Sequence, residues 1–303
     1  MSRPNANLLS AGFLVLGMFV FSLQDIAVRT IGGDYSVLQV VTLRSLVALP
    51  ATLIFFRREG GEGLPTTRQH KLQYLRGGCQ FLSFTAYMMA VAALPLAEVG
   101  AIRNSAPLMI TLLSVLWLGE KVDLRRWLAL GVGFVGVLLI VRPGAVNFNL
   151  GSVFALVATL FYALAVLVTR KLQATDSSAT MAYYSSQVYV IASVLLAPLA
   201  IMVGERPDAH PSIAFLFRAW TLPPPLAGSI MLGLGLVWAA GMYFNARAYS
   251  LAPASVVAPF EYVSLLISVL WGFLLWQEVP SATTGIGAAL TLLSGLYLLY
   301  QDR

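Results

Sequence analysis

The chain alternates long apolar stretches with short polar ones along almost its whole length. Ten of these stretches approach the roughly 20 mainly apolar residues that a membrane-spanning helix requires. They are residues 8–31, 35–56, 74–94, 97–118, 127–142, 150–169, 180–203, 226–249, 254–276 and 283–300. The pattern predicts an all-α integral membrane protein with ten transmembrane helices, and a count of nine is the main alternative.

The composition of the chain points the same way. Its 303 residues are 58% hydrophobic and only 11% charged, with a mean hydropathy of +0.80. Soluble domains carry about a quarter charged residues, so this chain is expected to lie largely within a bilayer. Residues 211–225, "PSIAFLFRAWTLPPP", are apolar but bounded by prolines. They predict a short helix at the membrane interface rather than an eleventh span.

The basic residues predict the orientation of the helices. Of the 19 lysines and arginines, twelve lie in the tails and in connections on the same side of the membrane as the N-terminus. Four lie in or beside the connections on the other side. The remaining three, Arg44, Arg103 and Arg247, fall inside predicted spans. Cytoplasmic connections of membrane proteins carry the excess of lysine and arginine, so both termini are expected in the cytoplasm. The basic residues are thus placed as in a membrane protein, and no nucleic-acid partner is expected.

The sequence also contains an internal repeat. "LPLAEVGAIRNSAPLMITLLSVLWLGEKV" begins at Leu94, and "LAPASVVAPFEYVSLLISVLWGFLLWQEV" begins at Leu251. The repeat predicts one compact transmembrane domain built from residues 1–145 and residues 146–303. Because five helices is an odd number, the second copy would be inverted relative to the first, as in many secondary transporters. Chance similarity between two apolar helices is the alternative.

Two paired segments carry a resemblance to a known family. They are residues 106–144 and residues 259–290, each with a small-residue helix, a closing glutamate, a short polar turn and a glycine-rich helix. In this order of features the chain resembles the bacterial ten-helix EamA-type exporters of the drug/metabolite transporter superfamily. The resemblance implies export or exchange of small metabolites, notably amino acids, across the inner membrane.

Glu261 is the first candidate for a functional group. It lies with Ser264 and Ser268 at spacings of three and seven residues, so the three share one face of a helix. A charge at the centre of a membrane helix costs about 2.5–3.5 kcal/mol, so this face is expected to turn away from lipid. Two interpretations remain open: a charge on the wall of a substrate cavity, or a salt bridge that locks helices together through an intramembrane arginine.

Other polar and aromatic residues complete the predicted substrate site. Two helices present stripes of such residues, and the position equivalent to Phe260 and Glu261 in the first repeat is also polar. The predicted residues are Gln80, Ser83, Phe84, Tyr87, Arg103, Asn104, Trp238, Tyr243 and Asn245, together with Glu261 and Ser264. An arginine and a glutamate near a pseudo-two-fold axis suit the two ends of a zwitterion. Helix packing is the alternative for the aromatic residues.

The remaining charges suggest structural roles. Asp25 and Arg29 are four residues apart on the first helix, where a local ion pair is expected. Glu120 and Glu278 are expected to cap the helices that follow them. The small-residue spacing Gly287–Thr291 favours close helix packing, within the bundle by default and between two copies as the alternative.

These features favour a transporter over an enzyme. Both histidines fall in predicted connections, and no converging catalytic set, nucleotide loop or metal-ligand cluster is apparent, so neither a cofactor nor a metal is expected. The sequence predicts a secondary transporter that exports or exchanges small neutral metabolites, amino acids above all, by alternating access. A carrier of nucleosides or amphiphiles, or a passive channel, is the alternative. The expected partners are the substrate and the bilayer; the oligomeric state stays open, and a monomer is compatible with the sequence.

Overall fold

The computed structural model describes residues 3–31, 34–58, 60–118, 123–142, 149–172, 175–251 and 258–301, and every regular element within these ranges is helical. The first half holds α1 (Arg3–Ile31), α2 (Val37–Arg58), α3 (His70–Val91), α4 (Leu96–Arg103), α5 (Ala106–Leu118) and α6 (Leu124–Val141). The second half holds α7 (Leu150–Leu172), α8 (Ser178–Val203), α9 (Pro211–Phe217), α10 (Pro225–Leu251), the 3-10 helix η1 (Ala258–Tyr262), α12 (Val263–Trp276) and α13 (Ala282–Gln301).

Each of the ten predicted stretches is helical over most of its described residues, in agreement with the predicted count of ten. Five helices are long and apolar enough to cross a membrane by length and composition: Leu8–Ile31, Val37–Arg58, Leu150–Thr169, Ser178–Val203 and Pro225–Asn245. Three shorter apolar helices lie at Trp127–Val141, Phe260–Trp276 and Ala282–Tyr297. The predicted short helix of residues 211–225 is α9, which covers only the first half of that segment.

Two of the ten spans are discontinuous at equivalent places in the repeat. The fourth span divides into α4 and α5 at Asn104 and Ser105. Both side chains bond back to the helix that they end: Asn104 Nδ2 donates to Gly100 O at 2.8 Å, and Ser105 Oγ donates to Ile102 O at 2.6 Å. Such bonds compete with regular helix geometry. In the ninth span η1 gives way to α12 at Tyr262, the residue that the repeat aligns with Ser105.

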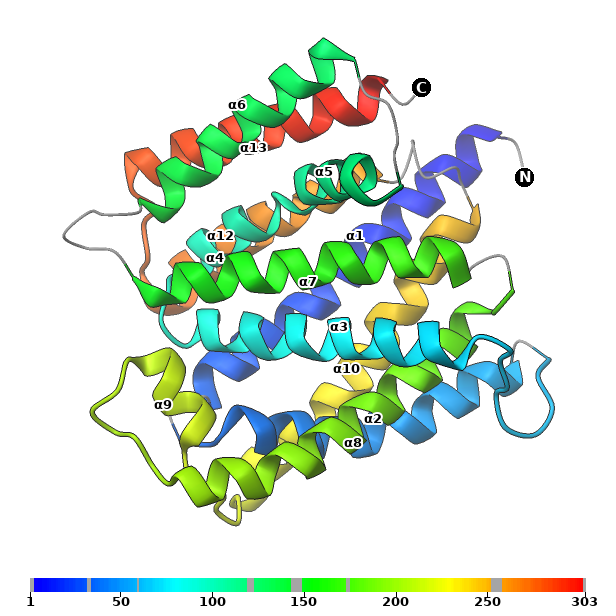
Figure 1. Cartoon of the computed structure of the whole chain (residues 1–303), viewed down its shortest axis with the longest axis vertical. Helices are drawn as coiled ribbons and strands as arrows, with labels where there is room; N and C mark the ends of the chain where they lie inside the picture. The colour runs from blue at the N-terminus through cyan, green and yellow to red at the C-terminus, as the bar shows by residue number, and fades with distance from the viewer. Residues whose placement is uncertain are drawn as a thin grey trace.

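The two halves of the chain are interleaved in space (Figure 1). α1 packs along α10, α3 along α7 and α6 along α13, so each of these contacts joins the first repeat to the second. The division at residues 145 and 146 therefore describes the repeat, not two separate bodies. Both termini lie at one end of the bundle, here called the terminal end, and α9 lies at the other, here called the α9 end.

Small residues bring α6 and α13 into close contact. A Cβ atom on Gly136 would lie 2.6 Å from the carbonyl oxygen of Gly287, and a Cβ on Gly287 would lie 2.5 Å from that of Gly136. The Thr291 hydroxyl donates to Gly287 O at 3.0 Å. The predicted small-residue spacing thus serves packing within the bundle, where close backbone approach replaces side-chain volume.

Replacement of Gly287 by leucine is expected to destabilise the protein by about 1–3 kcal/mol, because the side chain has no room at this contact. The midpoint of thermal unfolding in detergent measures the effect. Gly285→Leu is the matched control on the same helix, since nothing lies within 4 Å of a Cβ on Gly285. Equal midpoints for the two variants would show that the contact is not tight.

Single cysteines test the orientation that the basic residues predict. In a Cys79→Ser background, Leu64→Cys at the terminal end is expected to react with an impermeant thiol reagent only from the cytoplasm. Asp208→Cys at the α9 end should react only from outside. Both positions are exposed, and Leu64 is 62% accessible. Labelling of position 208 from the cytoplasm would reverse the proposed topology.

Candidate functional site

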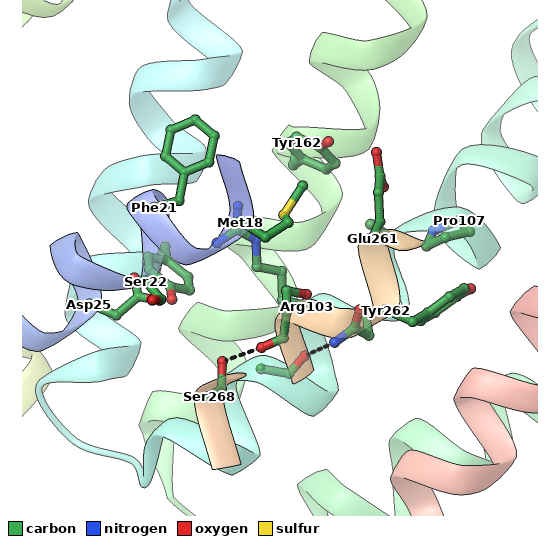
Figure 2. A pocket seen from close by; sticks show the side chains of 15 residues that line it. Met18, Phe21, Ser22, Asp25, Arg103, Pro107, Tyr162, Glu261, Tyr262 and Ser268 are labelled. Atoms are coloured by element: carbon green, nitrogen blue, oxygen red, sulfur yellow. Dashed lines mark hydrogen bonds between the residues drawn. The ribbon is translucent and has the colours of Figure 1, made fainter. Parts of the chain in front are cut away.

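A polar cavity of about 100 Å³ lies inside the bundle and is lined by both repeats (Figure 2). Helix α1, α3, the α4–α5 break, α7, η1 and α12 all contribute to its wall. The lining residues are Met18, Phe21, Ser22, Asp25, Tyr87, Gly100, Arg103, Asn104, Ala106, Pro107, Tyr162, Glu261, Tyr262, Ser264 and Ser268. The cavity thus forms where the two discontinuous spans approach each other.

Asp25 and Arg103 form the charged centre of this cavity. The two groups attract each other electrostatically, and the hydroxyl of Tyr87 lies beside both of them. The guanidinium carbon of Arg103 lies 5.0 Å from the centre of the Tyr87 ring, within the range of a cation–π contact. Asp25 is buried, whereas Arg103 is accessible and lines the cavity. The predicted local pair between Asp25 and Arg29 is therefore wrong.

Glu261 supplies a second carboxylate on the other side of Arg103 (Figure 2). The Tyr162 hydroxyl interacts electrostatically with both Glu261 and Arg103. Ser264 and Ser268 continue the same face of α12, and Ser268 Oγ donates to Ser264 O at 2.9 Å. The structure therefore turns the polar stripe that begins at Glu261 toward the cavity and away from lipid.

Five of the predicted substrate-site residues lie together on this wall: Tyr87, Arg103, Asn104, Glu261 and Ser264. Two others make contacts between helices instead. Ser83 Oγ donates to Ala158 O on α7 at 2.8 Å, and the carbonyl of Gln80 accepts from the Tyr189 hydroxyl at 2.7 Å. The first contact accounts for the hydroxyl of Ser83, whereas the second involves only the backbone of Gln80.

Tyr243 and Asn245 also lie away from the cavity, on α10. Tyr243 is 47% exposed and stacks on Phe55 with ring centres 5.7 Å apart. The backbone of Asn245 packs against Gly17 of α1. The alignment of Tyr87 with Tyr243 therefore relates two positions with different surroundings, because α3 is central and α10 has a lipid-facing side.

Sequence reasoning did not select several residues of the cavity wall. Met18, Ser22 and Asp25 share one face of α1 at spacings of four and seven residues, which is a helical pattern that could have identified them. Tyr162 stands alone in an apolar helix and offers no periodic signal. Among the described residues, no group of three histidine, cysteine or acidic side chains gathers as a metal site would require.

Phe84 and Trp238 surround a second intramembrane arginine, Arg44, which is only 2% exposed. The guanidinium carbon lies 3.8 Å from the Phe84 ring centre, 5.0 Å from that of Tyr189 and 5.9 Å from that of Trp238. Arg44 Nη1 also donates to Gln24 Oε1 at 3.0 Å. The charge is thus stabilised by aromatic faces and an amide, and within the described residues its contacts do not include a carboxylate.

A polar cluster, here called the clasp, joins the helices at the α9 end of the bundle, one helical turn from Asp25. Arg29 forms an ion pair with Glu278. Glu278 Oε2 accepts from the backbone N–H of Leu96 at 3.2 Å, and Arg29 Nη1 donates to Leu94 O at 3.3 Å. Arg29 also lies over the Trp276 ring, 4.7 Å from its centre. The clasp joins α1, the start of α4 and the end of α12.

The turn after α12 places Glu278 in this clasp. Gln277 adopts a left-handed conformation with φ of 56°, and Glu278 N donates to Gly272 O at 3.0 Å, so the chain reverses toward α4. The prediction that Glu278 caps the following helix is wrong. Ser281 does so by accepting from Thr284 N at 3.2 Å, whereas Glu278 caps α4. Glu120 lies outside the described residues.

Comparison with known proteins places this geometry in a family. The EamA-like transporter family matches the chain twice, over residues 8–142 and residues 149–300. The chain belongs to the EamA-like transporter family. The predicted class, an all-α membrane protein of ten helices in two inverted five-helix repeats, is confirmed, and so is the resemblance read from the paired segments.

Three EamA relatives show how varied the transported molecules of similar proteins are. A riboflavin transporter of Vibrio cholerae is 30% identical over 86% of this chain and 81% of its own length. An S-adenosylmethionine uptake transporter of Rickettsia conorii is 25% identical over 96% of this chain and 92% of its own length. A pseudopaline exporter of Pseudomonas aeruginosa is 27% identical over 96% of this chain and 97% of its own length. The chain is thus similar to small-molecule transporters of the membrane, in both directions of transport.

A solved structure shares the EamA fold at low sequence identity. Its crystal structure superposes with a TM-score of 0.63 at 17% identity and covers 99% of both chains. This likeness concerns the fold alone.

The clasp predicts strong coupling between Arg29 and Glu278. Arg29→Glu and Glu278→Arg are each expected to lower stability by about 1.5–3 kcal/mol, because each leaves two like charges in a partly buried site. The double exchange restores an ion pair and should recover more than half of the summed loss. Thermal unfolding of all four proteins gives the coupling energy. A double variant that simply adds the two losses would show that the pair does not stabilise the bundle.

Proposed function

We propose that the protein is a secondary transporter that carries small zwitterionic metabolites, amino acids above all, across the inner membrane by alternating access. The arrangement of Asp25, Arg103 and Glu261 in one cavity carries this proposal. An α-amino acid presents a carboxylate and an ammonium group a few ångströms apart, and the cavity holds groups of both complementary charges. An arginine is well suited to a carboxylate because its fork donates two parallel hydrogen bonds.

The electrostatic balance of the cavity favours such a ligand. Asp25 and Arg103 already attract each other in the absence of substrate. A zwitterion that enters between them gives its carboxylate to Arg103 and its ammonium group to Asp25, so each of the two charges exchanges one partner for another. The exchange leaves the net charge of the cavity unchanged. An anionic ligand would instead take Arg103 from Asp25 and leave this buried carboxylate unsatisfied inside the membrane, which is costly.

The aromatic wall of the cavity supports binding of the remainder of the substrate. The rings of Phe21, Tyr87, Tyr162 and Tyr262 line it. All four rings offer apolar faces, and the three tyrosines also carry hydroxyl groups. The cavity volume of about 100 Å³ suits the charged head of an amino acid, whereas ligand pockets usually reach about 300–1,000 Å³. Accommodation of a side chain therefore requires the cavity to widen.

Alternating access provides that widening. The clasp between Arg29 and Glu278 closes the cavity toward the α9 end, and its release would open the site on that side. The terminal end carries the basic residues Arg57, Arg58, Arg68, Lys71 and Lys171. The positive-inside rule therefore supports a cytoplasmic terminal end, with the clasp facing outward. The direction of net transport then follows the substrate gradients.

A carrier of uncharged aromatic metabolites is the second candidate. The four rings of the cavity wall favour it, since stacking with a planar ligand needs no charge. The similarity to a riboflavin transporter of Vibrio cholerae supports the same candidate. A passive channel is less well supported, because the clasp obstructs the α9 end.

Counterflow in proteoliposomes tests the proposal with the twenty amino acids, their amides and a set of nucleosides. We expect saturable exchange of at least one amino acid and a clear preference over its amide. Glu261→Gln and Arg103→Gln are each expected to lower this exchange about ten-fold or more, the value of a charge-assisted hydrogen bond. Arg103→Gln should also abolish the preference for the acid over the amide, since the lost group is the one that binds the carboxylate.

Leu266→Ala is the matched control for Glu261→Gln, because Leu266 is 67% exposed on the lipid side of α12. It should leave exchange intact. Exchange of nucleosides but not of amino acids would select the second candidate. Unchanged exchange in Glu261→Gln, with a normal unfolding midpoint, would remove Glu261 from the site.

A further inference from the structure

A second cavity, about 410 Å³ in volume, lies on the opposite side of α3 and α7 from the polar cavity. It is here called the apolar groove. Helices α2, α3, α7, α8 and α9 form it, and Figure 1 shows α3 lying between α7 and α8. Its lining residues are Leu38, Phe81, Leu82, Thr85, Ala86, Met89, Phe154, Val157, Phe161, Leu196, Leu199, Ala200, Val203, Leu216 and Phe217. The groove contains no charged side chain in its wall.

The groove and the polar cavity share one partition. On α3, Ala86 faces the groove while its neighbour Tyr87 faces the cavity. On α7, Phe161 faces the groove while its neighbour Tyr162 faces the cavity. The two helices pack along each other over much of their length. Whatever fills the groove therefore presses on the back of the helices that carry Tyr87 and Tyr162.

The groove is continuous with the lipid-facing surface of the bundle. Its edges are exposed, with 45% of Leu82, 56% of Leu199 and 47% of Val203 accessible. Its floor is buried, with only 3% of Phe81 and 5% of Met89 accessible. In a chain that crosses the membrane, an apolar hollow with this opening is filled from the hydrocarbon side.

The chain beside the groove at the α9 end carries two arginines, with Glu205 and Asp208 among them. Arg218 directly follows Phe217, which lines the groove, and the exposed Arg206 lies three residues beyond the lining residue Val203. Phosphate groups of lipids lie at this level of a membrane protein, near the ends of its spans, and attract basic side chains. Within the wall itself, the Thr85 hydroxyl is buried and has no hydrogen-bond partner. An ester carbonyl of a lipid offers the acceptor that the surrounding side chains lack.

We propose that the apolar groove binds an acyl chain of a membrane phospholipid, whose phosphate lies beside Arg206 and Arg218. The bound lipid supports the partition formed by α3 and α7. A zwitterionic substrate would find no charged partner in the groove. A second copy of the chain would have to insert a narrow apolar element below α9.

A photoreactive lipid tests this site directly. The probe is phosphatidylglycerol with a diazirine in its acyl tail, reconstituted with the full chain in vesicles. We expect the labels to concentrate on groove residues such as Leu82, Phe154, Leu199 and Phe217. Ala200→Phe fills the groove and should lower this labelling at least five-fold. Leu266→Phe adds the same ring on an exposed face of α12 and should leave it unchanged.

Two further measurements keep the test independent of folding and of the transported substrate. The double variant Arg206→Gln, Arg218→Gln leaves the groove open but removes the groups that bind the phosphate, and it should lower the labelling of the groove residues at least three-fold. The unfolding midpoint of each variant verifies that it is folded. The labelling requires no transport, so it stands whether or not amino acids are carried.

Three outcomes would overturn the proposal. Uniform labelling of the bundle that Ala200→Phe does not change would indicate only the ordinary lipid annulus. Cross-links between two protein chains at Leu199 or Phe217 would indicate a second copy in the groove. Displacement of the lipid by a transported amino acid or nucleoside would make the groove part of the substrate path.

Discussion

A charge inside hydrocarbon needs a partner within the protein, and this requirement organises the bundle. Three arginines meet it in three ways. Arg103 interacts electrostatically with Asp25 and Tyr87 across the central cavity, Arg29 forms an ion pair with Glu278 at the α9 end, and Arg44 contacts aromatic faces and an amide. In the first case the two charges line a cavity that a ligand can enter. The second and third hold helices of both repeats together.

The helix discontinuities follow from a related requirement for the backbone. Where a helix stops inside a membrane, its free N–H and C=O groups need other partners or a polar cavity. At the break, the backbone N–H groups of Asn104 and Ser105 donate to Gly100 O and Ile102 O, and Arg103, Asn104 and Ala106 line the cavity. The polar cavity and the irregular backbone thus depend on each other, as is common in transporters with inverted repeats.

The sequence was sufficient for the spans because hydrophobic length depends on the bilayer and not on tertiary detail. The sequence also predicted that the face with Glu261, Ser264 and Ser268 turns away from lipid, since helical spacing determines which residues share a face. The partners of charged residues were less predictable. Glu278 lies 249 residues from Arg29, and only the turn at Gln277 and the packing of α4 bring them together. Local spacing therefore suggested the wrong partners for both.

The aromatic residues show a second limit of sequence reasoning. Phe84 and Tyr87 are three residues apart on α3, yet one packs on Arg44 and the other lines the cavity. The predicted polar and aromatic face of α3 includes both residues, but a central helix has neighbours on every side. Residues that share one face can therefore lie in different environments. Tyr162 had no pattern to reveal it and becomes evident only when α7 is seen beside η1.

The position of α1 has a mechanical consequence. Gln24, Asp25 and Arg29 lie within two turns of one helix, and they bind partners on α2, on α4 and beyond the end of α12. A helix segment of this length moves as a rigid rod, so a twist or a shift cannot alter one of these contacts alone. A rigid movement of this segment would therefore change the contacts at the cavity, at Arg44 and at the α9 end together.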